Sequence, residues 1–359
     1  MTGIYIHVPF CAVKCPYCDF YSCNFSLNKI TQFKDAIIRN IMVYPAGIKA
    51  DTIYFGGGTP SLLPPEFITE IIRSISNHFD LHNSEITLEA NPCTVNRSKL
   101  YEYRKAGVNR LSLGIQSASD DELKFLGRKH NYEKAKAAVE DAAEIGFENI
   151  SCDMMIGLPN QTEASIDYTI KQFIALPIQH ISSYILKIEE NTKFYHDSVS
   201  DIIPDDDTTA NLYLFMTEQL NKAGFYQYEI SNFALNGFES KHNLKYWECK
   251  EYIGFGPSAH SYFNGNRYAV TNDLEAFIKA DKQNEFITDN NPGQQEEKIM
   301  LGLRLKKGIC LDDFPERKSY ILKKSYSLEK AGLLEIKDNY LNLTPKGFLV
   351  SNSIISSLI

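Results

Sequence analysis

The sequence predicts an α/β protein whose core is an incomplete (β/α)6 barrel. Six short β-rich runs recur before residue 187, and each leads through a polar or glycine-bearing turn to a stretch of helical periodicity. Alternating strands and helices form a parallel sheet covered by helices, and six such units fit an open barrel better than a two-layer sheet. The six runs are Gly3 to Val8, Asp51 to Phe55, Glu85 to Ala90, Asn109 to Gln116, Glu148 to Met155 and Gln179 to Leu186.

The first run illustrates how each strand should divide its side chains. Alternation sends Ile4, Ile6 and Val8 to one face, and Tyr5 and His7 to the other. We expect the second face to form the polar interior of the barrel. In barrels of this kind the functional residues gather where the strands end, so the chemistry should lie in the loops after the strands.

The 359 residues divide into three parts by pattern. Residues 1–190 hold the barrel units, and residues 191–290 extend the barrel with a helix at 209–224 followed by aromatic, glycine-rich, strand-like runs. Residues 291–359 combine a helix ending at Gly332 with two short runs around a "KDN" turn and another helix, a pattern compatible with a small α+β winged-helix domain.

Composition limits the classes of function. The net charge of −8 and the pI near 5.6 argue against a general nucleic-acid-binding surface, because phosphate neutralisation needs a basic face. From Lys298 onward, however, 11 Lys and Arg stand against 6 Asp and Glu. This leaves two roles for the last region, DNA binding and a capping domain with a solvated lysine face, of which we favour the second.

Eight cysteines in a chain that starts directly with a strand-like run indicate a reducing compartment. No apolar run approaches the roughly 20 residues that cross a bilayer. We therefore expect a cytoplasmic protein. Clustered thiols in such a compartment suggest a metal site.

Four of the cysteines fall between residues 11 and 23, in a C-x3-C-x2-C run followed by a fourth thiol. Cys11, Cys15 and Cys18 can hold three irons of a 4Fe-4S cluster and leave the fourth iron open. Two alternatives remain. A structural zinc site would need His7 or Cys23 as a further ligand, and Cys23 could instead close the cluster as a plain electron carrier.

A glycine triplet, "YFGGGTP", ends the second predicted strand. Glycines there let the backbone approach a ligand closely, although a flexible turn is the simpler interpretation. Three later strands end in Glu89, Gln116 and Asp153, and Arg128 is the cation available near them. One carboxylate at a strand end is usually a loop cap, but several polar ends facing one opening suggest a ligand site.

The C-x3-C-x2-C run with an aromatic residue before its last cysteine, together with the glycine triplet, resembles the radical S-adenosylmethionine (SAM) superfamily. In that family the amino and carboxylate groups of SAM chelate the open iron of the cluster, and an electron from the cluster cleaves SAM to a 5'-deoxyadenosyl radical. The resemblance implies Cys11, Cys15 and Cys18 as cluster ligands. It implies as SAM contacts Tyr5, Tyr17, Gly57, Gly58, Thr59, Glu89, Gln116, Arg128 and Asp153.

The order of these motifs resembles the branch that contains the oxygen-independent coproporphyrinogen III oxidases. Those enzymes carry a fourth cysteine where this chain has Phe20, and they have an N-terminal extension, whereas the first strand here starts at residue 3. An "HNLKYW" element instead resembles the marker of HemW-type heme chaperones. That resemblance implies a heme site at His242, Asn243, Tyr246 and Trp247, with Cys249 as a second candidate ligand.

The sequence thus favours a heme chaperone that carries a SAM-coordinated 4Fe-4S cluster. The alternatives are a radical SAM coproporphyrinogen III dehydrogenase and a structural zinc protein with a winged-helix domain. The implied partners are heme, heme-acceptor proteins that include membrane-associated respiratory proteins, and an electron donor if SAM is cleaved. Whether the chain acts as a monomer or a homodimer stays open, as does any enzymatic activity.

Overall fold

A computed structural model describes residues 1–359, and one 12-stranded sheet runs through most of the chain. All six predicted barrel strands are present and run parallel in chain order across the sheet. This confirms the predicted α/β barrel. The strands are β1 (Thr2–Val8), β4 (Lys49–Gly57), β5 (Asp80–Ala90), β6 (Arg110–Gln116), β7 (Ile150–Ile156) and β8 (His180–Ile185).

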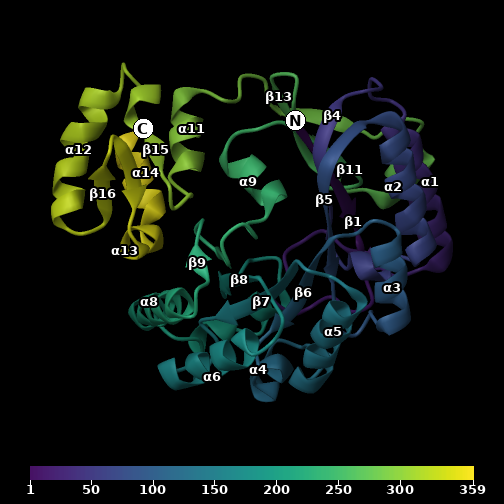
Figure 1. Cartoon of the computed structure of the whole chain (residues 1–359), viewed down its shortest axis with the longest axis horizontal. Helices are drawn as coiled ribbons and strands as arrows, with labels where there is room; N and C mark the ends of the chain where they lie inside the picture. Colours follow the sequence, from purple (N-terminus) through teal and green to yellow (C-terminus); the bar gives the residue numbers. More distant parts are fainter.

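Helices return the chain along the outer face of the sheet between these strands (Figure 1). The side chains of Asn96, Asn131 and Thr162 cap three of these helices by accepting a hydrogen bond from a backbone N–H in the first turn. The helices are α1 (Leu27–Ile41), α2 (Pro65–His78), α3 (Arg97–Lys105), α4 (Asp120–Phe125), α5 (Tyr132–Ile145) and α6 (Glu163–Ile174), with a 3-10 turn at Pro60–Leu62.

The main apolar core lies between the sheet and these helices. Ile4, Ile6 and Val8 are completely buried in it. Tyr5 and His7 point to the other face, toward the polar side chains of neighbouring strands. The alternation in the first strand therefore predicted both faces correctly.

The sheet continues beyond the barrel on both sides. A seventh parallel strand, β11 (Tyr252–Phe255), pairs with β1, and three antiparallel strands follow it; two further strands pair beyond β8. These outer strands are β12 (His260–Phe263), β13 (Asn266–Val270), β14 (Glu285–Asp289), β9 (Tyr226–Gln227) and β10 (Asn232–Ala234).

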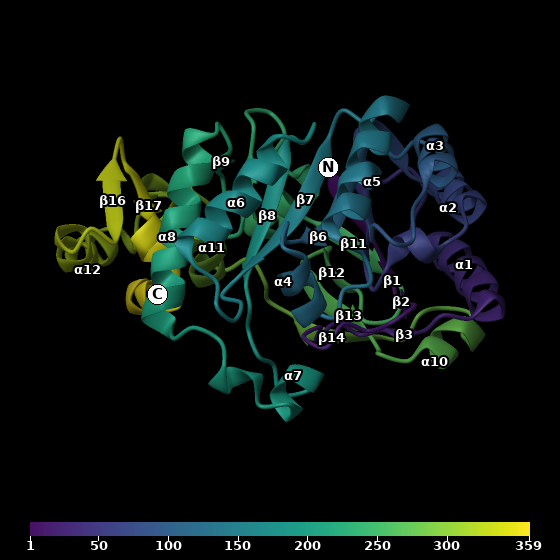
Figure 2. The same ribbon diagram turned by 90° about the horizontal axis from the view of Figure 1, so that it is seen from below.

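The second region contains more helix than its sequence suggested. The element "KHNLKYW" forms α9 (Lys241–Trp247) rather than a strand or loop, because Ser240 caps it by accepting from the N–H of Asn243. The other elements here are α7 (Lys193–His196), a 3-10 turn at Val199–Asp201, α8 (Asp206–Lys222) and α10 (Leu274–Lys279). Figure 2 shows α7 standing away from the remaining helices of the barrel.

The C-terminal region folds as a small group of helices around a three-stranded antiparallel sheet, at one side of the barrel (Figure 1). Asp338 and Asn339 both have a positive φ, 49° and 67°, which suits the two-residue turn between its longer strands. The predicted runs around the "KDN" turn are confirmed. The elements are α11 (Gln295–Gly302), β15 (Ile309–Cys310), a 3-10 turn at Leu311–Asp313, α12 (Lys318–Lys330), β16 (Leu334–Lys337), β17 (Tyr340–Leu343), α13 (Pro345–Leu349) and α14 (Ser351–Leu358).

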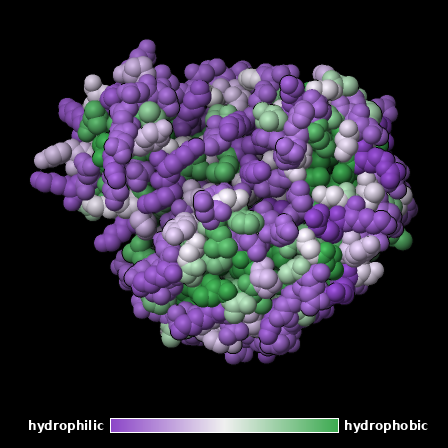
Figure 3. Space-filling view, in the orientation of Figure 1, coloured by the Kyte–Doolittle hydropathy of each residue, from purple (hydrophilic) through white to green (hydrophobic).

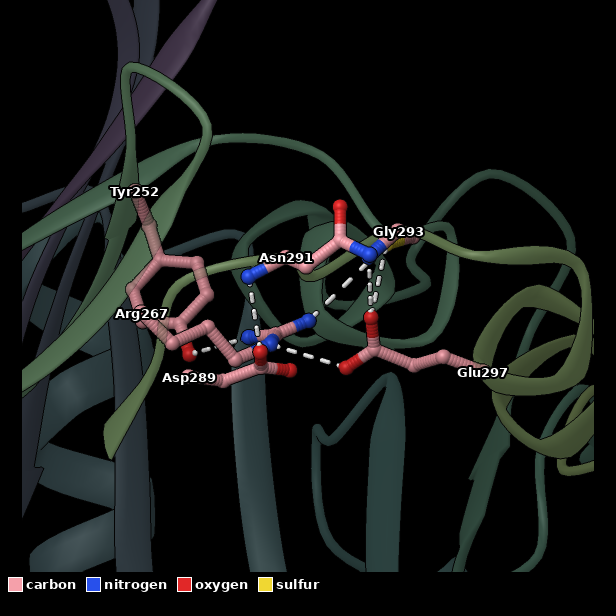
Figure 4. A network of polar contacts seen from close by, with 7 residues as sticks. Tyr252, Arg267, Asp289, Asn291, Gly293 and Glu297 are labelled. Atoms are coloured by element: carbon pink, nitrogen blue, oxygen red, sulfur yellow. Dashed lines mark hydrogen bonds and ion pairs between the residues drawn. The ribbon is translucent and has the colours of Figure 1, made fainter. Parts of the chain in front are cut away.

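A polar network connects the sheet extension to the start of α11 (Figure 4). Arg267 donates from Nε to Glu297 Oε1 at 2.8 Å and from Nη1 to the Tyr252 hydroxyl at 3.1 Å. Glu297 also accepts from the backbone N–H of Gly293. Both ion-pair partners are largely buried, so this contact fixes where the C-terminal region leaves the barrel.

No helix is long and apolar enough to span a membrane. On the face shown in Figure 3, polar side chains cover most of the surface and apolar side chains occupy separate small areas.

Gly308→Ala should destabilise the C-terminal region strongly. Gly308 has a φ of +66°, and an added Cβ would lie 1.9 Å from the carbonyl oxygen of Leu341. Gly332 has a similar φ of +70° with nothing within 4 Å of its Cβ position, so Gly332→Ala should show only the backbone strain of about 1–2 kcal/mol. Calorimetric unfolding of both variants checks this, and equal losses would contradict it.

Candidate functional site

The three cysteines of the predicted cluster lie on the loop that leaves β1. Cys11 ends β2 (Phe10–Cys11) and is buried, and the half-buried Cys15 and Cys18 follow before β3 (Cys23–Asn24). The N–H of Cys18 donates to the carbonyl of Cys15 at 3.1 Å, which makes a tight turn between them. None of the chain's cysteines forms a disulfide.

The contacts of these thiols suit deprotonated, metal-binding sulfur. Cys15 Sγ accepts from Nη1 of Arg128 at 3.5 Å, and Cys11 Sγ lies 3.6 Å from the Thr59 hydroxyl. For Cys18, in contrast, burial raises the pKa and the charges of Cys15 and Cys11 raise it further, so this thiol needs a bound cation to lose its proton. The chain has no group of three His, Cys, Asp or Glu side chains converging on one metal ion. A cluster does not require such convergence, because each thiolate binds its own iron.

The glycine triplet packs directly against this loop. Backbone N–H groups of Gly58 and Thr59 donate to the carbonyls of Val8 and Phe10, each at 2.8 Å. A Cβ on Gly58 would lie 2.7 Å from the Phe10 carbonyl oxygen and 3.1 Å from Cys11 Sγ. Any side chain at this position would therefore displace the loop, so glycine is required at 58 for this close approach, whereas Gly57 is the residue with a positive φ, +108°.

Both of the predicted strand-end carboxylates are half-buried and face the barrel interior. Glu89 accepts from the Tyr54 hydroxyl at 2.8 Å and from the N–H of Gly57 at 3.2 Å, and Asp153 accepts from the Ser112 hydroxyl at 3.3 Å. Burial raises the pKa of Glu89 to about 7 and that of Asp153 to about 6. Both groups can thus accept a hydrogen bond from a ligand or, with a proton bound, donate one.

Gln116 and Arg128 complete the opening of the barrel. Gln116 has a φ of 83°, an unfavourable backbone conformation for a residue other than glycine, and such strain often marks a binding site. Arg128 donates to the carbonyl of Gly114 and is held beside Cys15. Half-buried Tyr17 lies on the cysteine loop near Arg128, and burial raises its pKa.

Tyr5 connects the opening with the deeper interior. Its hydroxyl lies 3.1 Å from Nδ1 of His7, and its ring faces that of Tyr54 at 6.2 Å between centroids. The structure thus gathers the residues predicted to contact the cluster and SAM around one opening, where the predicted strands end.

The predicted heme residues lie elsewhere. His242 on α9 is buried beneath the barrel. Its backbone N–H donates a hydrogen bond to the Glu85 carboxylate on β5. Its ring nitrogens lie 2.8 Å from the Thr52 and Tyr246 hydroxyls. Burial lowers the pKa of His242 to about 3, so its imidazole is neutral.

The rest of α9 is more accessible than His242. Asn243, Tyr246 and Trp247 are half-buried, and the helix contacts β4 and α11. Figure 1 shows it between the parallel strands and the C-terminal region. The structure therefore keeps this element together but separates it from the cysteine loop, at the opposite end of the strands.

Sequence reasoning missed several interior residues. Tyr54, which orients Glu89, and Arg110, which is 2% exposed, were not singled out. Both point into the barrel by the same alternation that placed Tyr5 and His7, so the pattern within β4 and β6 could have identified them.

Fold and site together define a radical SAM protein. The protein-family model described as "Radical SAM superfamily" matches residues 5–173 of the sequence. The family model described as "HemN C-terminal domain" matches residues 293–350. Members of the superfamily carry a 4Fe-4S cluster and SAM, and the thiols and glycine turn described above fit these groups. More narrowly, relatives of at least 32% identity over the full length of the chain are named heme chaperone HemW, so the chain belongs to that family.

Two full-length relatives support that assignment. "Heme chaperone HemW" of Lactococcus lactis is 32% identical over 100% of this chain and 97% of its own length. The protein of the same name from Bacillus subtilis is 34% identical over 100% of this chain and 99% of its own. The structure of coproporphyrinogen III oxidase HemN from Escherichia coli has a TM-score of 0.83 at 20% identity, covering 99% of this chain and 89% of that one, and shows the shared fold.

Cys15→Ser should lose the cluster, because a serine hydroxyl is a far weaker iron ligand than a thiolate. Cys93→Ser, outside the loop, should retain it. Iron and acid-labile sulfide per chain after anaerobic reconstitution distinguish the two variants. If both variants bind wild-type amounts of iron, the ligand assignment is wrong.

Glu229→Gln should flatten the pH dependence of stability. Glu229 is fully buried, one of its carboxylate oxygens has no hydrogen-bond partner, and burial raises its pKa from 4.5 to about 7. The folded protein therefore holds a proton that the unfolded chain has lost, and its stability falls as the pH rises through this window.

Urea unfolding of wild type and Glu229→Gln at pH 5 and pH 8 measures this effect, with the exposed Glu190→Gln as control. The free energy of unfolding of Glu229→Gln relative to that of wild type should be higher at pH 8 than at pH 5. An equal effect of Glu229→Gln at both pH values would show that the buried carboxyl does not titrate in this range.

Proposed function

We propose that the protein is a heme chaperone, which binds heme and transfers it to acceptor proteins. The observation that carries this proposal is its full-length membership of a family whose curated relatives in L. lactis and B. subtilis are named heme chaperones. The cysteine loop and the glycine turn support a cluster and SAM as resident groups of the same chain.

The chain's own residues would hold these groups as follows. Cys11, Cys15 and Cys18 ligate the cluster, and Arg128 beside Cys15 offsets negative charge on its sulfur. When bound, cluster and SAM supply one-electron chemistry. The residues proposed to contact SAM are Tyr5, Tyr17, Gly57, Gly58, Thr59, Glu89, Gln116, Arg128 and Asp153.

Heme is proposed to bind at α9. In the present conformation both ring nitrogens of His242 have hydroxyl partners, so iron ligation requires α9 to move away from β4. The half-buried rings of Tyr246 and Trp247 would then offer aromatic surface to the macrocycle. Cys249, two residues beyond Trp247, is the alternative ligand, although burial raises the pKa of its thiol.

The wider organisation is proposed on the same basis. Residues 1–190 form the SAM-binding barrel, 191–290 its heme-binding extension and 291–359 the C-terminal domain. The protein would act in the cytoplasm, deliver heme to acceptors that include respiratory proteins at the membrane, and need an electron donor if SAM is cleaved. Sedimentation of the cluster-loaded protein distinguishes a monomer from a homodimer.

Heme titration monitored by intrinsic fluorescence tests the function, since Trp247 is the only tryptophan. Heme binding at α9 should quench most of its emission. His242→Ala should weaken heme binding without changing iron and sulfide content, whereas His82→Ala, on an exposed histidine, should change neither. Absence of quenching in the cluster-loaded wild type would contradict heme binding at α9.

The enzymatic alternative has its own test. Anaerobic incubation with coproporphyrinogen III, SAM and a reductant should give no decarboxylated product, because Phe20, 67% exposed, stands where the oxidases have a cysteine. Turnover of the porphyrinogen would replace the chaperone proposal with the enzymatic one.

A further inference from the structure

Arg110 is the largest buried cation that the site described above does not use. It lies on β6, where Leu111 and Leu113 face the apolar core and Arg110 and Ser112 face the barrel interior. Only 2% of the residue is exposed. In the sheet it pairs with Thr87 of β5, while Ser112 pairs with Glu89. Arg110 therefore sits two residues deeper than the predicted SAM contact Glu89, about 6–7 Å along the strand.

The guanidinium of Arg110 lacks the partners that a buried charge requires. It takes part in none of the chain's salt bridges, whereas the buried Lys245 is paired with Asp51 at 2.6 Å. Its Nε has no hydrogen-bond partner, and neither has the hydroxyl of the adjacent Thr87. An arginine stays charged at any physiological pH, and an unpaired buried charge costs several kcal/mol.

No carboxylate around Arg110 forms a salt bridge with it. Glu85, two residues before Thr87 on the same face of β5, accepts hydrogen bonds from the backbone N–H groups of Lys241 and His242 instead. His180 is hydrogen-bonded to Ser151 at 2.7 Å and to the Tyr228 hydroxyl at 2.9 Å, and burial, followed by the charge of Arg110, lowers its pKa. Burial, followed by the charges of Lys245 and Arg110, lowers the pKa of His242, which is therefore also neutral. Glu89 and Asp153 have other hydrogen-bond partners, and their raised pKa values show that burial outweighs the attraction of Arg110.

We propose that Arg110 and the Thr87 hydroxyl form a carboxylate-binding subsite in the floor of the barrel, below the predicted SAM contacts. The planar guanidinium can donate two parallel hydrogen bonds to a carboxylate, and the Thr87 hydroxyl can donate a third. A carboxylate bound there compensates the buried charge and accepts hydrogen bonds from Arg110 Nε and the Thr87 hydroxyl, which have no other partner.

Two ligands can bring this carboxylate. The first is a porphyrin propionate, which rests on the proposed heme function. The second is the amino-acid carboxylate of SAM, in a binding mode in which that carboxylate does not chelate the cluster iron. Both use the same chemistry, so the test must separate the two sources.

The experiment compares matched ligand pairs on the cluster-loaded protein under anaerobic conditions. Heme is compared with heme dimethyl ester, whose propionates are blocked, and SAM with decarboxylated SAM, which lacks only the carboxylate. Each dissociation constant is measured for wild type, Arg110→Gln, Thr87→Val and the control Arg97→Gln, whose side chain is 56% exposed.

Wild type should prefer the carboxylate-bearing member of one pair by about 10- to 100-fold, the effect of a charged hydrogen bond. Arg110→Gln should abolish that preference, Thr87→Val should reduce it, and Arg97→Gln should leave it unchanged. The pair that responds identifies the source of the carboxylate. If both preferences in Arg110→Gln equal those of wild type, the subsite does not exist.

Two further readouts keep the outcomes distinct. If Arg110→Gln does not fold, as its thermal unfolding would show, Thr87→Val decides the question, because a valine removes only the hydroxyl. If wild type binds neither heme nor its ester, the heme proposal fails, while the SAM pair still decides whether the carboxylate subsite exists.

Discussion

The candidate site depends on two backbone hydrogen bonds that hold the cysteine loop against the glycine turn. Gly58 and Thr59 donate to the carbonyls of Val8 and Phe10, so the loop that bears Cys11, Cys15 and Cys18 is fixed to the end of β4. The contact is close enough that a single methyl group on Gly58 would collide with it. Because β4 also carries Tyr54, the same strand positions the thiols on one side and Glu89 on the other.

The interior of the barrel contains charged side chains, although most folds place apolar side chains in their interior. The half-buried Glu89 and Asp153 face the same interior as the buried Arg110, yet the carboxyl groups take their hydrogen bonds from hydroxyl and backbone donors instead of from the arginine. Such an interior is unfavourable for the folded chain alone, since raised carboxyl pKa values and an uncompensated guanidinium both reduce stability. Ligands that bring complementary charge would remove this penalty, so binding and stability should be strongly linked.

The fold and the outline of the site could be predicted from sequence because they rest on local patterns. Alternation in "GIYIHV" separated the core face from the interior face, and the spacing of Cys11, Cys15 and Cys18 needed no tertiary information. The helical state of "KHNLKYW" was missed because seven residues show too little periodicity, and the Ser240 cap that starts the helix is a weak signal by itself. The absence of a partner for Arg110 could not be predicted, because it depends on which side chains reach it across the barrel.

The position of α9 joins the two proposed functions through side-chain packing. The His242 ring stacks on Tyr54 at 5.1 Å and on Tyr5 at 6.3 Å between centroids, and those tyrosines contact Glu89 and His7 on their other sides. Movement of α9 that frees His242 for heme iron would therefore remove one wall from the residues proposed to hold SAM. Conversely, a ligand that fixes Tyr5 and Glu89 would favour the docked helix, and the coupling must be equal in both directions. A heme chaperone built in this way would release or accept heme according to the state of its SAM site, without chemistry at the porphyrin.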